Sequence, residues 1–121
     1  MHWNQLLVIA QTEVDSVVQS LPGRLREQVA TLPITFELKP KPELVADGIE
    51  PDILGLFFGP AFADEESSPL PPHVILFLDN LWDAAEGDED IFREEIRITL
   101  LHELGHYLGL DEDELTERGL E

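Results

Sequence analysis

The 121-residue sequence contains no cysteine, so it can form neither disulfide bonds nor thiolate metal sites. Any metal ion would therefore need histidine and carboxylate ligands. No apolar run approaches the roughly 20 residues that span a membrane, and the N-terminus lacks the basic segment and apolar core of a signal peptide. These absences make a cytoplasmic protein without a membrane partner the expected class.

Positive charge is also scarce. Seven Lys and Arg residues stand against 26 Asp and Glu residues, which gives a formal net charge of -19 at pH 7. Such a surface repels phosphate groups, so nucleic acid is not an expected partner. It would favour a basic substrate or a basic protein partner, although solubility alone also explains a charge of this kind.

The length of the chain suits one hydrophobic core, so we expect residues 1–121 to form a single domain. Hydrophobic residues make up 43% of the sequence, as is usual for a globular protein. No feature of the sequence indicates an oligomeric state.

Hydrophobic periodicity separates expected helices from expected strands. The predicted elements are helices at 3–21, 24–30 and 89–108, strands at 34–38, 51–60 and 73–78, a helical turn at 81–85 and a short helix that begins at Asp111. Segment 51–60 is apolar and punctuated by glycine, so we expect a buried strand with a bulge at Gly55. Gly109 suits a left-handed C-cap at the end of the long helix.

The end of the long helix carries the pattern H-E-x-x-H, at His102, Glu103 and His106. Residues four apart lie on one face of a helix, so His102 and His106 can present two imidazoles to one metal ion. Glu103 is turned by about 100° from His102. Its carboxylate is thus beside the metal, where it can take a proton from a metal-activated water. Apolar residues surround the motif, so the helix is expected to be buried and the polar side chains to need partners.

A zinc enzyme usually has a third protein ligand. The spacing resembles that of proteases with H-E-x-x-H-x-x-G-x-x-H, in which the glycine lets the chain turn so that the residue six after the second histidine reaches the metal. Gly109 stands at the glycine position here. The residue six after His106 is Glu112, with Asp111 and Asp113 as alternatives if the register differs by one. The predicted site is therefore one Zn²⁺ ion bound by His102, His106 and Glu112.

Other candidate residues fit this chemistry less well. His2 is expected to be solvated, and His73 to be structural or to lie at the rim of a cleft. Tyr107 is expected to pack rather than to contact a substrate. Ser67 and Ser68 have no nearby base, which argues against a serine nucleophile.

The segment L-H-E-L-G-H-Y-L-G-L-D-E-D-E-L resembles the signature of a small bacterial zincin-like family of possible metallopeptidases. The similarity extends to 51–59 and 72–77 and covers most of residues 30–118. It implies an α+β, minimal zincin-like fold, in which a small mixed sheet packs against an N-terminal helix and a buried C-terminal active-site helix. It also implies that His102 and His106 bind the metal, that Glu103 is the catalytic acid and base, and that Glu112 supplies the third ligand.

We therefore expect a zinc-dependent metallopeptidase that hydrolyses a peptide or protein substrate, extended or basic in character. We expect the cleft to lie between the motif-bearing helix and the strand at 74–78, with the substrate paired along a strand edge. The alternative is a catalytically silent, metal-stabilised acidic domain that binds a basic protein partner.

Overall fold

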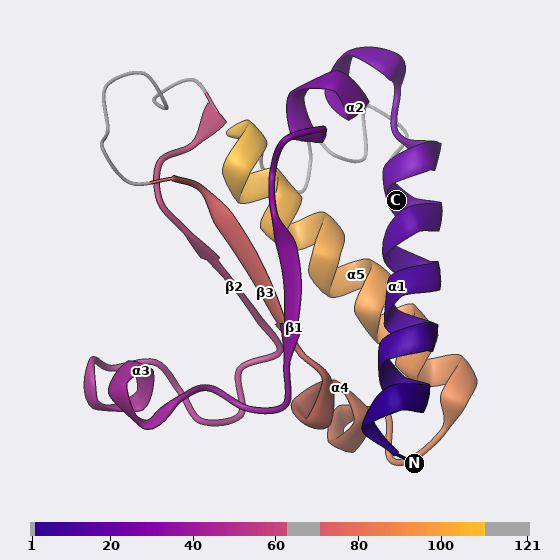
Figure 1. Ribbon diagram of the computed structural model, residues 1–121, viewed down its shortest axis with the longest axis vertical. Helices are drawn as coiled ribbons and strands as arrows, with labels where there is room; N and C mark the ends of the chain where they lie inside the picture. Colours follow the sequence, from indigo (N-terminus) through magenta and orange to yellow (C-terminus); the bar gives the residue numbers. More distant parts are fainter. Residues whose placement is uncertain (1, 63–70, 111–121) are drawn as a thin grey trace.

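The computed structural model describes residues 2–62 and 71–110 of the chain, and Figure 1 shows their arrangement. The elements in chain order are α1 (Trp3–Ser20), α2 (Gly23–Val29), β1 (Ile34–Glu37), α3 (Pro42–Ala46), β2 (Gly55–Phe58), β3 (His73–Phe77), α4 (Leu78–Ala84) and α5 (Glu89–Leu108). The fold is α+β, which confirms the predicted class. None of the helices within the described ranges combines the length and apolar character needed to cross a membrane.

The three strands form one mixed sheet in the order β1-β3-β2. β1 pairs with β3 in parallel, whereas β2 pairs with β3 in the antiparallel sense. β3 lies in the centre, and every residue of it after His73 is buried. This position explains its nearly continuous apolar sequence, because a strand covered on both faces has no polar side.

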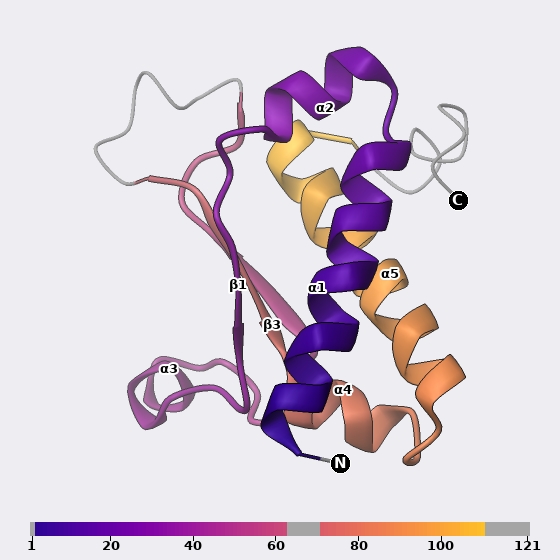
Figure 2. The same ribbon diagram turned by 45° about the vertical axis from the view of Figure 1, so that its right-hand side comes forward.

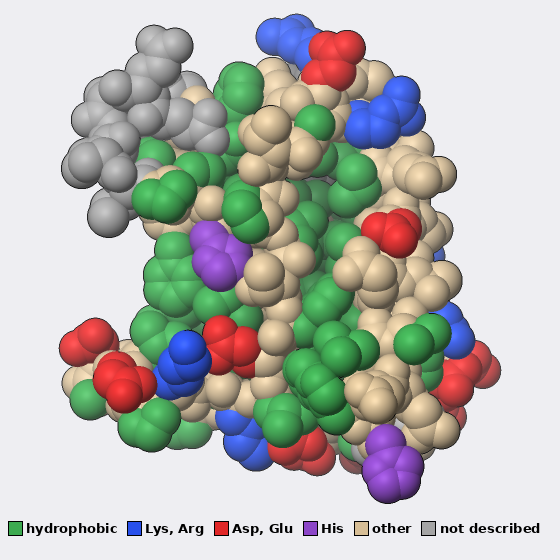
Figure 3. Space-filling model, viewed as in Figure 1, with side chains coloured by type: hydrophobic (Ala, Val, Ile, Leu, Met, Phe, Trp, Pro, Cys, Tyr) green, Lys and Arg blue, Asp and Glu red, His purple; other side chains and the backbone are tan. Residues whose placement is uncertain are grey.

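Helices α1 and α5 pack on the same side of the sheet, as the views in Figures 1 and 2 agree. Val74 and Leu76 of β3 point to that side and belong to the main hydrophobic core together with buried residues of α1, α4 and α5. α5 contacts α1, α2, α4, β2 and β3. In the view of Figure 3, hydrophobic side chains gather over the sheet, while most charged ones lie toward the periphery. α5 is thus the element that connects the sheet to the other helices.

Local signals define both ends of α5. The Asp88 side chain accepts a hydrogen bond of 3.1 Å from the Ile91 backbone N–H, which caps the first turn. At the other end Gly109 adopts a left-handed φ of 72°, and Leu110 N–H donates to Gly105 C=O at 2.8 Å. This six-to-one bond is the C-cap geometry that favours glycine. Both predicted boundaries of the helix and its glycine cap are confirmed.

Other predicted elements differ from the structure in detail. β2 begins at Gly55 and lies at the edge of the sheet, so the prediction of a buried strand with a bulge there is wrong. α3 was not predicted, because its five residues begin with Pro42 in a segment without clear periodicity. The short helix expected from Asp111 lies outside the described residues.

The segment before β2 is held by a buried asparagine on α4. Asn80 is 5% exposed, and its amide nitrogen donates to the carbonyls of Pro51 and Ile53, both at 2.9 Å. Its amide oxygen accepts a hydrogen bond from Lys39 Nζ at 3.2 Å. Every polar atom of this side chain therefore has a partner, as a buried amide requires.

We expect Asn80→Asp to lower the free energy of unfolding by about 2–3 kcal/mol, because the carboxylate cannot donate to the two carbonyls and leaves them unsatisfied. Lys39→Met is the matched control and should cost less than about 1 kcal/mol, since the Lys39 side chain is more than half exposed. Urea unfolding followed by circular dichroism measures both. Equal stability of Asn80→Asp and the wild type would show that these hydrogen bonds do not hold the segment.

Candidate metal centre

The last two turns of α5 present two histidines side by side. His102 and His106 are four residues apart, so both project from the same face of the helix. Their ring centroids are 4.5 Å apart, with an angle of 64° between the ring planes. Both residues are exposed, and the His106 side chain is 53% accessible. The prediction of a helix buried all round is therefore wrong for this one face.

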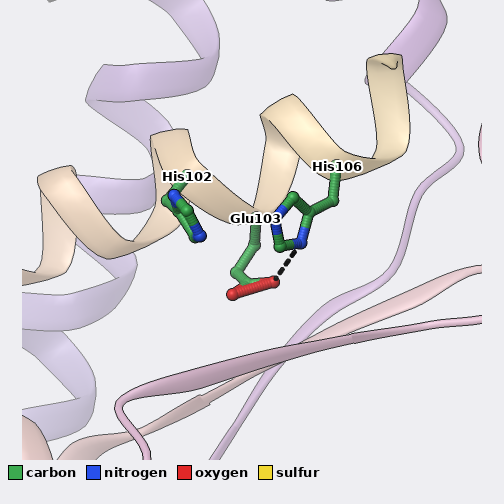
Figure 4. Close-up of side chains that lie close together, drawn as sticks. All are labelled: His102, Glu103 and His106. Atoms are coloured by element: carbon green, nitrogen blue, oxygen red, sulfur yellow. Dashed lines mark ion pairs between the residues drawn. The ribbon is translucent and has the colours of Figure 1, made fainter. Parts of the chain in front are cut away.

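Glu103 is buried, in contrast to the two histidines, and only 7% of it is exposed. One of its carboxylate oxygens, Oε2, lies 3.4 Å from Nδ1 of His106. Figure 4 shows the three side chains extending from α5 toward the strands, with the carboxylate beside the imidazole of His106. The single buried charge of the motif thus has a polar partner of its own, which reduces the cost of its burial.

The three side chains suit a divalent metal ion. Each offers one ligating atom, and these atoms all lie within 4.8 Å of one another. Two ligands of a tetrahedral zinc ion lie about 3.3 Å apart, given Zn–N distances near 2.0–2.1 Å. Side-chain rotations that move the ligating ring nitrogens by on the order of 1 Å would bring the two imidazoles to that spacing. Imidazole nitrogen and carboxylate oxygen are both ligands that zinc accepts.

The structure does not describe the predicted third ligand. Glu112 and the alternatives Asp111 and Asp113 lie outside the described residues. What the structure does give is the turn at Gly109 that precedes them.

A cleft of about 560 Å³ opens beside the histidines. Its lining comes from α5, from β2 and from the two residues before β2, namely Ile53, Leu54, Gly55, Leu56, Phe57, Glu95, Ile98, Thr99, His102, Glu103 and His106. A volume of this size is typical of ligand sites. The strand wall is therefore β2, and the prediction that the strand at 74–78 forms it is wrong. That strand is β3, which lies between β1 and β2 in the centre of the sheet.

β2 offers free backbone groups beside this cleft. Phe77 N–H donates to Leu54 C=O at 3.0 Å. This hydrogen bond shows which residues of β2 direct their backbone N–H and C=O groups toward β3. Because hydrogen-bonded and non-hydrogen-bonded pairs alternate in antiparallel strands, Leu56 turns its backbone groups toward β3. Gly55 and Phe57 turn theirs the other way, to the edge at which no other described strand pairs. These are the groups an extended peptide could use.

The close approach of β2 to α5 depends on the absence of a side chain at Gly55. A Cβ atom there would lie 2.8 Å from Cγ2 of Thr99 and 3.2 Å from Cδ2 of Leu76. Thr99 lies one turn before Glu103, so this contact sets the distance between the strand wall and the cluster of His102, Glu103 and His106. The sequence offered only a weak signal for it, a glycine inside an apolar strand, which often marks close backbone approach.

Tyr107, His73 and His2 are not part of the three-residue cluster. Ser67 and Ser68 lie outside the described residues. Tyr107 is fully buried; its hydroxyl donates to Gln28 C=O at 3.4 Å, and its ring contacts that of Phe57. It packs, as predicted. His73 Nε2 lies 2.6 Å from Thr35 Oγ1 across β1 and β3, which confirms a structural role rather than a place in the cleft. The exposed His2 precedes α1, at the other end of the chain.

Taken with the fold, the cluster defines a small α+β protein that can hold a divalent metal ion in an open cleft. The model of the zincin-like metallopeptidase family matches residues 29–120, which include the whole sheet and α5. The chain belongs to this zincin-like metallopeptidase family. Comparison with curated proteins found no match. Membership of the family implies a divalent metal, typically zinc, and a peptide or protein substrate.

The Gly55–Thr99 contact can be tested by a double mutant. We expect Gly55→Ala to cost about 1–3 kcal/mol of stability, because the added methyl group overpacks the interface. Thr99→Ser removes the methyl group it would meet, so the double mutant should recover much of that loss. Gly23→Ala serves as the control, since an alanine there meets only Arg26 Nη2 at 3.9 Å. Additive effects of the two substitutions would contradict the assignment.

Proposed function

We propose that this protein is a zinc-dependent peptidase in which His102 and His106 bind one zinc ion and Glu103 is the general base. The observation that carries the proposal is the placement of a buried carboxylate between two exposed imidazoles, facing a strand with a free edge. Family membership supports the same reaction class. We propose Glu112 as the third ligand, with Asp111 and Asp113 next.

The substrate would bind as an extended strand beside β2. Backbone groups of Gly55 and Phe57 can hydrogen-bond a peptide, as in other cases of strand addition. Pairing of this kind fixes the peptide backbone and leaves its side chains to the cleft walls. The scissile bond would then lie opposite the histidine pair, at the point where Glu103 reaches the cleft.

Glu103 performs the proton transfers. Zinc, when bound, polarises the scissile carbonyl and makes water more acidic. The Glu103 carboxylate accepts the proton of the attacking water and returns it to the leaving amine. Its burial suits this role, because a carboxylate held by surrounding side chains keeps its orientation through both transfers.

We expect His106→Ala to lose zinc, with an affinity at least about 100-fold weaker. Removal of a residue that only hydrogen-bonds a metal ligand lowers metal affinity by about 10–100-fold, so removal of a ligand itself should lower it further. His2→Ala is the matched control and should keep the wild-type zinc content. Elemental analysis after dialysis measures both. Full zinc stoichiometry in His106→Ala protein would refute the proposed site.

We expect Glu103→Gln to retain zinc and its melting temperature while its peptide hydrolysis falls by at least about 100-fold, as for loss of a general base. Glu94→Gln, on the exposed surface of the same helix, should leave the rate unchanged. Mass spectrometry of a digested peptide library provides the measurement. If zinc-loaded wild type and Glu103→Gln are equally inert, the silent, metal-stabilised acidic domain that binds a basic partner becomes the better description.

A further inference from the structure

Glu95 lines the same cleft as the histidines but has no role in the chemistry proposed above. It precedes His102 by seven residues and His106 by eleven, and both spacings are close to a whole number of helical turns. The three side chains therefore project along one line of α5. Glu95 lies about 10–16 Å from the histidines along the helix axis, at 1.5 Å per residue.

No cation is paired with Glu95 among the described residues. Two arginines lie two residues from Glu95 along the helix. Arg93 donates to Glu89 at 3.1 Å and to Glu13 at 3.2 Å. These hydrogen bonds, first that to Glu89, raise the pKa of Arg93 above its usual value, which keeps it a cation committed elsewhere. Arg97 is exposed, and side chains two residues apart on a helix do not face each other. Lys39 lies near Asp79 and Asp83. The carboxylate of Glu95 is thus available to a ligand.

The surroundings of Glu95 increase the influence of its charge. Ile98 is 54% exposed and lies between Glu95 and His102 along the cleft. Ile53 and Leu54 line the opposite wall. An apolar wall lowers the local dielectric constant, so a carboxylate there attracts a cation more strongly than one surrounded by water.

The directions of α5 and β2 determine which part of a substrate would meet Glu95. Gly55 lies against Thr99, and the Phe57 ring lies 5.8 Å from that of Tyr107, so β2 and α5 run the same way. A peptide paired antiparallel to β2, the more stable mode, runs from the histidines toward Glu95. An extended peptide advances about 3.4 Å per residue, so the distance from the histidines to Glu95 corresponds to about three to five substrate residues. A long basic side chain can bridge about one residue of that distance, so its own position would be two to four residues from the scissile bond.

We propose that Glu95 is a specificity-determining residue that selects peptides with Lys or Arg two to four residues to the C-terminal side of the cleaved bond. This inference rests on the proposed peptidase function and names its substrate class. The acidic character of the chain, with a formal charge of -19, acts in the same direction by attracting basic peptides.

The test uses one cleavable peptide sequence in versions that differ at a single position. Lys or Gln is placed two, three or four residues to the C-terminal side of the bond, or at matching positions on the N-terminal side. We expect kcat/KM of the zinc-loaded wild type to favour Lys on the C-terminal side by about fivefold, the size of a partly exposed ion pair. The preference should shrink in 1 M salt.

Variants assign the preference to one carboxylate. Glu95→Gln should abolish the Lys preference, so that kcat/KM becomes equal for the Lys and Gln peptides. Glu95→Lys should reverse the preference in favour of versions that carry Glu at the same position. Glu94→Gln is the matched control for net charge and should keep the wild-type preference. A preference that survives in Glu95→Gln, or that appears on the N-terminal side, would overturn the proposal.

Binding separates this proposal from the peptidase function. Fluorescence anisotropy of the same labelled Lys and Gln peptides can be measured on Glu103→Gln protein and on the Glu95→Gln/Glu103→Gln double mutant. Tighter binding of Lys peptides that depends on Glu95 supports the assignment even if the wild type cleaves nothing. Equal binding of Lys and Gln peptides by both proteins refutes it, whether or not the wild type is active.

Discussion

The distance between β2 and α5 controls what this site can do. Gly55 brings the strand into contact with the Thr99 side chain, and the next turn of the helix carries Glu103. A peptide held on the free edge of β2 would then lie within reach of residues fixed on a rigid helix. Catalytic geometry generally requires positioning to within about 0.5 Å, which regular elements provide better than loops. A strand and a helix in direct contact meet that requirement with few residues.

The sequence predicted α5 well because its signals are local. Asp88 and Gly109 cap its ends, and the four-residue spacing of the histidines determines that they share a face. Its environment was harder to predict. A strongly apolar helix suggested burial on every side, yet one row that includes Ile98 and both histidines remains exposed, because β2 covers only part of the helix.

The cleft wall could not be predicted, because strand order is a non-local property. The segment at 73–78 has the stronger strand pattern, and this made it the natural candidate for the wall. Its apolar character instead reflects a central position with both faces covered. The glycine-containing segment with the weaker pattern forms the edge. The third metal ligand depends on residues after Leu110, so Glu112 stays a prediction, as does a single domain over residues 1–121.

Burial divides the motif into two functional parts. Glu103 is enclosed, and its carboxylate has His106 beside it, whereas the imidazoles face solvent. An exposed imidazole exchanges water for a metal without opening the core, so metal can enter a folded protein. In the proposed function, the same helix thus combines an accessible binding group with a preorganised reacting group.

A strand edge that accepts a peptide also accepts any other extended chain, including a second copy of this protein. Exposed edges of this kind are a recognised route to aggregation, and proteins usually blunt them with charge, proline or a covering element. β2 itself carries no charged residue, since it reads Gly-Leu-Phe-Phe. The formal charge of -19 on the whole chain opposes such pairing, because it makes copies of the protein repel one another. Colloidal stability in this protein should therefore fall as salt screens that charge, well before the fold itself is affected.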